Sequence, residues 1–264
     1  MRTLVVRPEK TREAACFFRK EDNVQKFIAD DSFWELFPHA SIGIIVARDM
    51  KPASAIPPDD AAAIAKLLRE ANEHANSYLT SNTISENAPV RAWREAYQQF
   101  KTKKGARSSV ENLLKRVLKG NPVGSITPSV DVYNAISLKY AFPVGGEDLD
   151  SLDGDLRLGI TEGGDAFLPL GEEDEDPTLP GELCYCDNVG AVCRCWNWRD
   201  GQRTALTDDS ANAFLIIENV DPARTDDLRA ALDEFVTRMQ RYFNATITQH
   251  TIIDRDHPEA VIKE

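Results

Sequence analysis

The sequence predicts an α+β fold in which a mostly antiparallel sheet packs against helices. Helical patterns concentrate between residues 57 and 119 and again at 226–243, and short apolar runs separated by turn residues fill much of the chain after Leu156. With 264 residues, 42% of them hydrophobic, the chain can bury one substantial core. We expect a single domain at 28–264, with a helical portion at 57–119 and a mainly β portion at 130–253, after a loosely ordered extension at 1–27.

Each expected element rests on its own pattern of apolar residues. The run Ser41–Arg48 is apolar and β-branched, which is typical of a buried strand. Capping residues at 57–60 precede a first helix, and apolar positions spaced by three or four predict two more at 89–101 and 108–119. Segment 130–138 fits either a helix or a strand. Strands are expected at 156–160, 166–170, 182–186, 192–198, 203–206 and 214–218, before a helix at 226–243 and a strand at 245–253.

Charge and hydropathy exclude several classes of protein. The formal net charge of -12 argues against a general nucleic-acid binder, because Lys and Arg must neutralise phosphates. No stretch approaches the roughly 18 to 20 apolar residues that a membrane span needs. Charged residues interrupt the N-terminal apolar runs too early for a secretory signal. We therefore expect a cytoplasmic protein with no membrane partner.

The charges are unevenly distributed along the chain. Residues 91–119 hold nine bases and two acids, a local balance of +7. Residues 145–188 hold one base and fourteen acids, a balance of -13, and include the acidic run at 172–176. Such segregation fits a protein that holds a phosphate backbone on one side and works elsewhere, although two solvated faces of opposite sign would give the same pattern.

Cysteine spacing favours structural thiols over a metal site. The five cysteines, at positions 16, 184, 186, 193 and 195, are an odd number and are crowded, which is a poor framework for disulfides. Zinc ligands are usually separated by about two to four residues, whereas each pair here is separated by one. Because alternate residues of a strand face the same side, we expect both Cys-x-Cys pairs to line one buried face of a hairpin, without a metal.

Motifs for the commonest nucleotide, zinc-protease and serine-hydrolase sites are absent from the sequence. The acids at 148, 150, 153 and 155 miss the spacing of a calcium loop, so we interpret them as a solvated turn. The four histidines are scattered, and no catalytic triad can be assembled from them. We therefore expect no cofactor.

Several segments match a known domain in the same order along the chain. They are Val130-Asp131-Val132-Tyr133-Asn134, then Pro143, then Asp148-Leu149-Asp150, and later Leu215-Ile216-Ile217-Glu218. This set resembles the B3/B4 editing domain of the phenylalanyl-tRNA synthetase β subunit, in which Val-Asp-x-Thr-Asn precedes Pro-x-His-x-Phe-Asp-Leu-Asp and a later strand ends in a pocket glutamate. The segments 93–97, 111–120 and 194–199 resemble freestanding members of that family. The resemblance covers about residues 28–245 and implies a B3/B4-like fold.

The sequence departs from the synthetase pattern at the pocket. Tyr133 stands where the synthetase has Thr, Gly145 stands where it has the pocket His, and Glu147 replaces an aromatic residue. These changes imply a reshaped amino-acid pocket, so the editing of tyrosine is not carried over. Added acids favour a polar or cationic side chain. Among freestanding relatives one removes canavanine, an arginine mimic, from arginine tRNA, and canavanyl-tRNA(Arg) is our best single substrate hypothesis.

The resemblance implies roles for individual residues. An aminoacyl ester is already activated, so a site need mainly position a water. Asn134 would orient the ester or the water, and Gly145 and Gly146 would offer N–H donors to the oxyanion. Glu218 would accept a hydrogen bond from the distal end of the wrong amino acid, and Tyr133, Pro143 and Glu147 would complete the substrate pocket. Asn134 as a cap and Glu218 as a strand-end ion pair are the alternative interpretations.

Basic residues are the expected contacts to tRNA, the predicted partner. The candidates are Arg94, Lys101, Lys103, Lys104, Arg107, Lys115, Arg116 and Arg199. Trp196 and Trp198 would share one face of a strand and could stack a terminal base, or could be core aromatics. We predict a deacylase of mischarged aminoacyl-tRNA acting in trans, with no obligate protein partner. A tRNA-binding or regulatory module without catalysis, and a binder or hydrolase of a free amino-acid derivative, are the alternatives.

Overall fold

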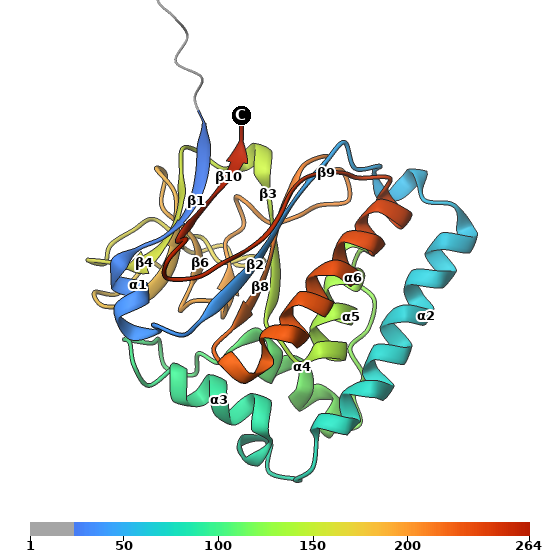
Figure 1. The fold of residues 1–264 in the computed structure, drawn as a ribbon, viewed down its shortest axis with the longest axis horizontal. Coiled ribbons are helices and arrows are strands. Elements are labelled where there is room, and N and C mark those ends of the chain that lie inside the picture. The colour runs from blue at the N-terminus through green and yellow to red at the C-terminus, as the bar shows by residue number, and fades with distance from the viewer. Residues whose placement is uncertain (1–23) are drawn as a thin grey trace, which may run out of the picture.

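The chain folds into two β-sheets and a layer of helices in the computed structural model (Figure 1). The structure describes residues 24–264, so most of the expected extension at 1–27 lies outside the described residues. β1 (Gln25–Ala29) begins inside that expected extension and pairs with two other strands. Residues 25–27 therefore belong to the folded domain.

The two sheets are assembled from strands that lie far apart in the sequence. The first has the order β10-β1-β4-β5-β6-β7 and consists of β1, β4 (Leu156–Ile160), β5 (Leu183–Cys186), β6 (Ala191–Arg194), β7 (Arg199–Asp200) and β10 (Glu259–Lys263). The second has the order β3-β8-β2-β9 and consists of β2 (Ser41–Arg48), β3 (Val144–Asp148), β8 (Ala213–Asn219) and β9 (Thr246–Ile253). Among these strands the β1–β4 pair is parallel and the other pairs are antiparallel. The predicted α+β class with a mostly antiparallel sheet is confirmed.

The described chain also forms α-helices, whose ends follow the sequence signals. They are α1 (Asp31–Leu36), α2 (Pro58–Ala75), α3 (Ala88–Ala96), α4 (Ser109–Leu118), α5 (Pro128–Tyr140) and α6 (Thr225–Phe243). α5 begins where the Thr127 hydroxyl accepts a hydrogen bond from Val130 N at 3.4 Å and Pro128 takes the first position. It ends at Ala141, which adopts the left-handed conformation with φ 50°.

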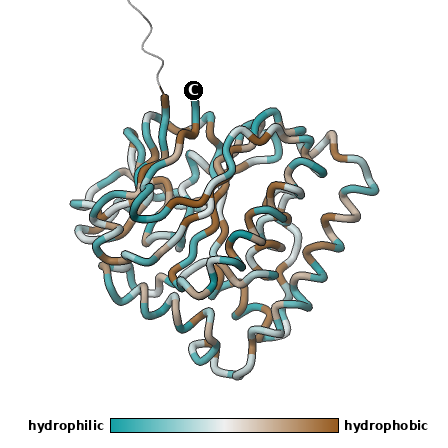
Figure 2. Tube along the Cα trace, viewed as in Figure 1, coloured by the Kyte–Doolittle hydropathy of each residue, from teal (hydrophilic) through white to brown (hydrophobic). Residues whose placement is uncertain are grey.

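The second sheet is the middle layer and has a core on each face. On one face Ile45, Leu215 and Ile217 pack with residues of α5 and α6. On the other face Phe214 contacts Phe27 of the first sheet, with ring centroids 5.4 Å apart. Hydrophobic stretches accordingly follow the central strands and one side of α6, whereas the outer loops are hydrophilic (Figure 2). A sheet that is buried on both faces places its side chains between the layers, where a site can be enclosed.

Some expected elements differ from the structure. Segment 130–138, which fitted either conformation, lies within helix α5. The strands predicted at 166–170 and 203–206 are wrong, since these segments contribute only the isolated bridges Pro169–Gly201 and Ala205–Glu147. The strand predicted at 192–198 ends at Arg194, because Cys195 and Trp196 adopt positive φ values of 46° and 63° that no strand accommodates.

Candidate active site

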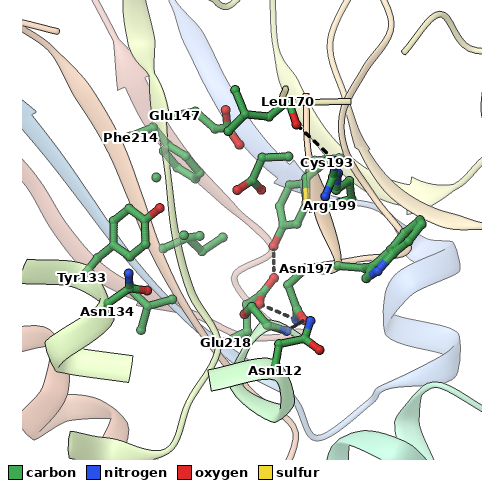
Figure 3. Close-up of a pocket in the computed structure, with 18 of the residues that line it drawn as sticks. Asn112, Tyr133, Asn134, Glu147, Leu170, Cys193, Asn197, Arg199, Phe214 and Glu218 are labelled. Atoms are coloured by element: carbon green, nitrogen blue, oxygen red, sulfur yellow. Dashed lines mark hydrogen bonds between the residues drawn. The ribbon is translucent and has the colours of Figure 1, made fainter. Parts of the chain in front are cut away.

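A cavity of about 430 Å³ lies between the two sheets, beside the first half of α5 (Figure 3). This volume falls within the range of small-molecule sites. Its polar walls come from α4, α5, β3, β7, β8 and the turn after β6. The lining residues used below are Asn112, Tyr133, Asn134, Gly145, Gly146, Glu147, Leu170, Tyr185, Cys193, Asn197, Trp198, Arg199, Asp200, Phe214 and Glu218.

Helix α5 carries two of the predicted residues to this cavity. Tyr133 and Asn134 both line it and lie together on its α5 side (Figure 3). Asn134 is 7% exposed, and its amide makes no hydrogen bond to another residue of the described chain. A cap or turn role would require such a bond, so the geometry favours an amide that is available to a ligand.

Asp131 of the same motif has a structural task. Its carboxylate accepts a hydrogen bond from Ile126 N at 2.8 Å and another from the Ser125 hydroxyl. Ile126 lines the cavity although its side chain is 70% exposed, so it lies at the mouth. Asp131 thereby fixes the loop before α5 at the rim of the site.

The two predicted glycines differ in what their backbones can do. Pro143 O accepts from Glu218 N at 3.1 Å, and Asp148 N donates to Thr204 O on the opposite side of β3. Because backbone groups alternate along an antiparallel ladder, Gly145 N–H points toward β8, and Gly146 N–H points to the side that β8 does not cover. Gly146 is therefore the better candidate for an oxyanion donor.

Side-chain space also separates these glycines. A Cβ at Gly146 would come within 2.7 Å of both Leu206 Cδ1 and Leu215 Cδ2, so the packing there requires glycine. At Gly145 a Cβ would meet only Ile216 Cγ2 at 3.5 Å, an ordinary contact. Gly145 faces the same side of β3 as Glu147, toward the cavity, and its lack of a side chain leaves that space open. Pro143 does not line the cavity and contributes through its carbonyl.

Glu218 lies at the end of β8 with both carboxylate oxygens engaged. The Tyr185 hydroxyl donates to its Oε1 at 2.5 Å, and Asn197 Nδ2 donates to its Oε2 at 2.6 Å (Figure 3). Burial raises the pKa of Glu218 to about 7, although these two hydrogen bonds act in the opposite direction. The side chain is 1% exposed, and a fixed carboxylate can still accept further donors on its remaining lone pairs.

Asn197 was not predicted, and it connects Glu218 to the helices. Its Oδ1 accepts from the Tyr97 hydroxyl at 3.0 Å and from Ser109 N at 3.2 Å. With both acceptor bonds on Oδ1, its Nδ2 is oriented as the donor to Glu218. Only the tertiary fold brings these segments together, so no local pattern indicates this role for Asn197.

Two more carboxyl groups, Glu147 and Asp200, line the cavity. Burial, and next the charge of Asp200, raise the pKa of Glu147 well above its usual value. Burial likewise raises the pKa of Asp200 and that of Cys193. The charges of Asp200 and Glu147 raise the pKa of the Cys193 thiol further. Glu147 was predicted as a pocket residue, whereas Asp200, in the two-residue strand β7, was missed.

The tryptophans behave differently from the expectation. Trp196 is fully buried, with its ring centroid 4.7 Å from those of both Phe37 and Trp93, so it is a core residue that no base can reach. Trp198 lines the main cavity and also a second one of about 530 Å³. The predicted shared face of a strand is wrong because β6 ends before both residues.

Several predicted RNA contacts are engaged in ion pairs. Arg94 contacts the buried Glu111 at 2.6 Å, and Arg107 lies 3.8 Å from the same carboxylate. Lys103 pairs with Asp176, and Arg199 pairs with Glu172 at 2.8 Å. The basic and acidic segments therefore meet beside the second cavity instead of lying apart. The exposed candidates that make no ion pair within residues 24–264 are Lys101, Lys104, Lys115 and Arg116.

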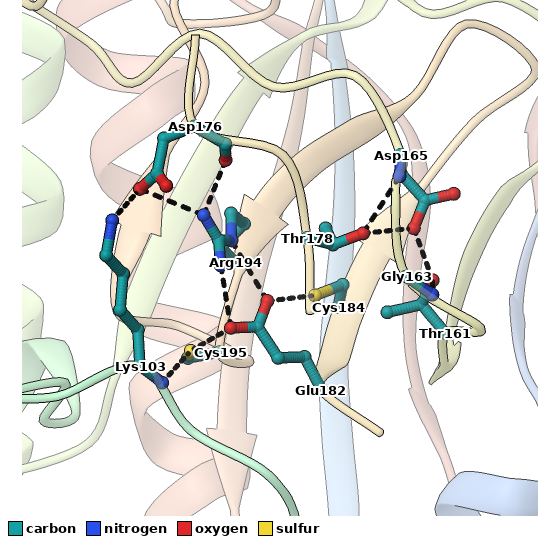
Figure 4. Close-up of polar contacts among 10 residues, drawn as sticks. All are labelled: Lys103, Thr161, Gly163, Asp165, Asp176, Thr178, Glu182, Cys184, Arg194 and Cys195. Atoms are coloured by element: carbon teal, nitrogen blue, oxygen red, sulfur yellow. Dashed lines mark hydrogen bonds and ion pairs between the residues drawn. The ribbon is translucent and has the colours of Figure 1, made fainter. Parts of the chain in front are cut away.

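Two of the cysteines, Cys184 and Cys195, lie beside a buried ion pair (Figure 4). Arg194 Nη2 contacts Glu182 Oε1 at 2.7 Å, and both side chains are fully buried. The thiols of Cys184 and Cys195 donate to the Glu182 carboxylate, whereas Cys193 lines the active-site cavity, so the four do not share one face as expected. Within residues 24–264 no group of three His, Cys, Asp or Glu side chains is placed to hold a metal ion.

None of the helices in the described part of the chain is long and apolar enough to cross a membrane. No curated protein matches the sequence. Among solved structures the chain is similar to an N-terminal fragment of the phenylalanyl-tRNA synthetase β subunit from Pyrococcus horikoshii, with 13% identity and a TM-score of 0.44, over 85% of this chain and 50% of that chain. The chain thus spans about half the length of that fragment.

Residues 92–254, more than half of the sequence, match the B3/4 domain family. The matched range contains α5, β3 and β8, which supply Asn134, Gly146 and Glu218 to the cavity. The matched range also contains, in the same order, the segments 130–134, 148–150 and 215–218 that resemble the B3/B4 domain in sequence. This chain belongs to the B3/4 domain family.

Proposed function

We propose that this protein hydrolyses the ester of a mischarged aminoacyl-tRNA in trans. The observation that carries the proposal is the convergence in one cavity of an unpartnered amide, a backbone N–H that points away from β8 and a fixed carboxylate, from Asn134, Gly146 and Glu218. An aminoacyl ester needs a positioned water and charge stabilisation more than a strong nucleophile. The lack of a histidine among the lining residues of the described chain is compatible with that chemistry.

The proposed reaction uses water as the nucleophile. Asn134 orients a water against the ester carbonyl carbon, and Gly146 N–H stabilises the developing oxyanion. The bond between the carbonyl carbon and the ribose oxygen then breaks. That oxygen receives a proton derived from the water, which leaves a free amino acid and an intact tRNA.

Substrate binding is assigned to the remaining cavity residues. Glu218 accepts a hydrogen bond from the bound amino acid, Tyr133 and Glu147 line other walls of the cavity, and Pro143 holds the end of β8. Canavanyl-tRNA(Arg) is the substrate we propose first, because a guanidino-like group would suit the acidic walls. The exposed bases Lys101, Lys104, Lys115 and Arg116 are proposed to contact the tRNA backbone.

The test is a deacylation screen with tRNAs that carry different non-cognate amino acids. We expect hydrolysis of at least one, and its loss in Asn134→Ala. The matched control is Asn121→Ala, since Asn121 is exposed and does not line the cavity. Binding of tRNA without hydrolysis would favour a non-catalytic module. Faster hydrolysis of a free amino-acid ester than of any aminoacyl-tRNA would favour the third alternative.

A further inference from the structure

The cavity contains more negative charge than its proposed reaction requires. Three carboxyl groups line it, those of Glu147, Asp200 and Glu218. Tyr185 and Asn197 satisfy Glu218 from within the protein. Hydrolysis of an ester calls for a water and oxyanion donors, so the other two carboxyl groups need a separate explanation.

Glu147 is buried with few partners, and burial raises its pKa more than the Thr204 hydroxyl and the charge of Arg203 lower it. Its side chain is 7% exposed, and its Oε2 is buried without a hydrogen bond to any described residue. A buried carboxylate oxygen left in this state is costly unless a ligand supplies the donor. Glu147 lies on the wall of the cavity away from Glu218, at the side nearest Leu170 (Figure 3).

Asp200 places a second carboxyl beside Glu147. It comes from the first sheet, whereas Glu147 comes from the second, so the two sheets contribute one acid each. Asp200 pairs with Cys193 across β6 and β7, and both line the same cavity as Glu147. In addition to burial, the charges of both carboxyl groups raise the pKa of the Cys193 thiol. Two like charges in a dry site repel each other and are stabilised by a cation bound between them.

Two bases of the described chain act on this pair, but other groups hold them. Against the larger effect of burial, Arg203 lowers the pKa of Glu147 and Arg199 that of Asp200. Arg203 contacts Asp187 at 2.7 Å. Within residues 24–264, Arg199 is the one basic side chain that lines the cavity. Its Nη2 donates outward, to Leu170 O at 3.1 Å and to Glu172 Oε1 at 2.8 Å. The acid pair is thus left for a ligand.

We infer that Asp200 and Glu147 form a receptor for the cationic end of the bound acyl group, a guanidinium or an ammonium, and that Asp200 determines this specificity. A planar guanidinium can donate to both carboxylates, because it carries five N–H groups in a rigid fork. The assignment deepens the proposed function and rests on it for the ester end of the substrate. The cation site itself is tested with amino-acid amides, which carry the side chain of the acyl group but no tRNA ester.

The experiment measures binding of L-argininamide and L-citrullinamide to the full chain by calorimetry at pH 8. The two probes have nearly the same shape, but citrullinamide carries a neutral urea in place of the guanidinium. We expect the wild type to prefer argininamide. Asp200→Asn should weaken argininamide binding by roughly 10- to 150-fold, the effect of one charge-assisted hydrogen bond. Citrullinamide affinity should change by less than about twofold.

Two further variants complete the test. Glu147→Gln should reproduce the selective loss, and it replaces Asp200→Asn if that variant does not fold. Asp256→Asn removes one charge from an exposed turn outside the cavity and should change neither affinity. Equal affinity of the wild type for both probes, an unchanged argininamide affinity in Asp200→Asn, or equal losses for both probes would overturn the assignment.

Failure of the proposed function would look different. A wild type that binds argininamide through Asp200 but hydrolyses no aminoacyl-tRNA would retain the cation receptor and reject the deacylase. A wild type that hydrolyses aminoacyl-tRNA, together with an Asp200→Asn variant that keeps the wild-type rates on both cationic and neutral substrates, would retain the deacylase and reject the receptor.

Discussion

The hydroxyl of Tyr185 donates a 2.5 Å hydrogen bond to Glu218 Oε1, and this bond joins β5 of the first sheet to β8 of the second across the cavity. The carboxylate is buried, and its second oxygen is held by Asn197 at 2.6 Å. The two sheets are therefore coupled through a group whose pKa is raised to about 7 by burial. Protonation of Glu218 then affects both the stability of the fold and the charge of the site.

Stability should fall as the pH rises from about 5 to 8. The pKa of Glu218 is about 7 in the folded protein and 4.5 as its model value. Between these values the folded state binds more protons than the unfolded state, so the free energy of unfolding decreases with pH, by about 3 kcal/mol for this group. Burial of Glu147 and Asp200 acts in the same direction. Urea unfolding at several pH values measures the slope, which Glu218→Gln should reduce.

Glu218→Gln should also alter substrate preference. The amide keeps the shape of the side chain but removes the charge, so turnover of a cationic misacylated tRNA should fall by roughly 10- to 150-fold. A small neutral aminoacyl group should be affected far less. Single-turnover hydrolysis with both substrates measures the difference. Equal losses would mean that Glu218 acts on the ester or the water shared by both.

Gly145 and Gly146 should respond differently to alanine. Gly146→Ala would force a Cβ to within 2.7 Å of two leucine methyl groups, so it should lower the melting temperature. Gly145→Ala has room, with its nearest contact at 3.5 Å, and should fold normally. Its methyl group would enter the cavity, so kcat/KM should drop while stability is kept. Thermal melts and kinetics of the two variants check this, and the reverse ranking of stability would contradict the strand orientation.

The RNA surface should lie on the exposed bases that make no ion pair. Replacing Lys101, Lys104, Lys115 and Arg116 together by alanine should weaken tRNA binding and flatten its salt dependence by up to about four ion equivalents. Lys103→Ala is the comparison, because Lys103 already neutralises Asp176. It should change the salt slope by less than the mean effect of the other four. Binding titrations across salt concentrations measure both, and an unchanged slope in the quadruple variant would move the surface elsewhere.

The sequence predicted the elements that carry a clear helical period or a continuous apolar run. Helix α6 and strands β2 and β8 show clear periods or apolar runs, and they occur close to their expected places. Helix α5 could not be distinguished from a strand because residues 129–132 and 134–138 are all buried, which removes the amphipathic signal. The runs at 166–170 and 203–206 are apolar in sequence, yet they form loops around the cavity.

The sequence indicated only part of the candidate site, because some of its residues meet only in the folded chain. Tyr133, Asn134, Gly145, Gly146, Glu147 and Glu218 were expected from a resemblance, and all six line the cavity, while their roles stay predictions. Asp200 and Asn197 follow a tight turn after β6 and lie far in sequence from Glu147. Only the pairing of the strands brings them into the cavity, so no local pattern could have indicated them.

The pairing of β1 with β10 has a consequence for synthesis of the protein. Gln25 lies opposite Lys263, so this strand pair forms only after residues 259–263 have been synthesised. Contacts of such long sequence separation form slowly. Until then β1 pairs with β4 alone and leaves its other edge open, with unpaired N–H and C=O groups. A growing chain therefore exposes a strand edge that could pair with another chain, and the folded protein covers this edge with β10.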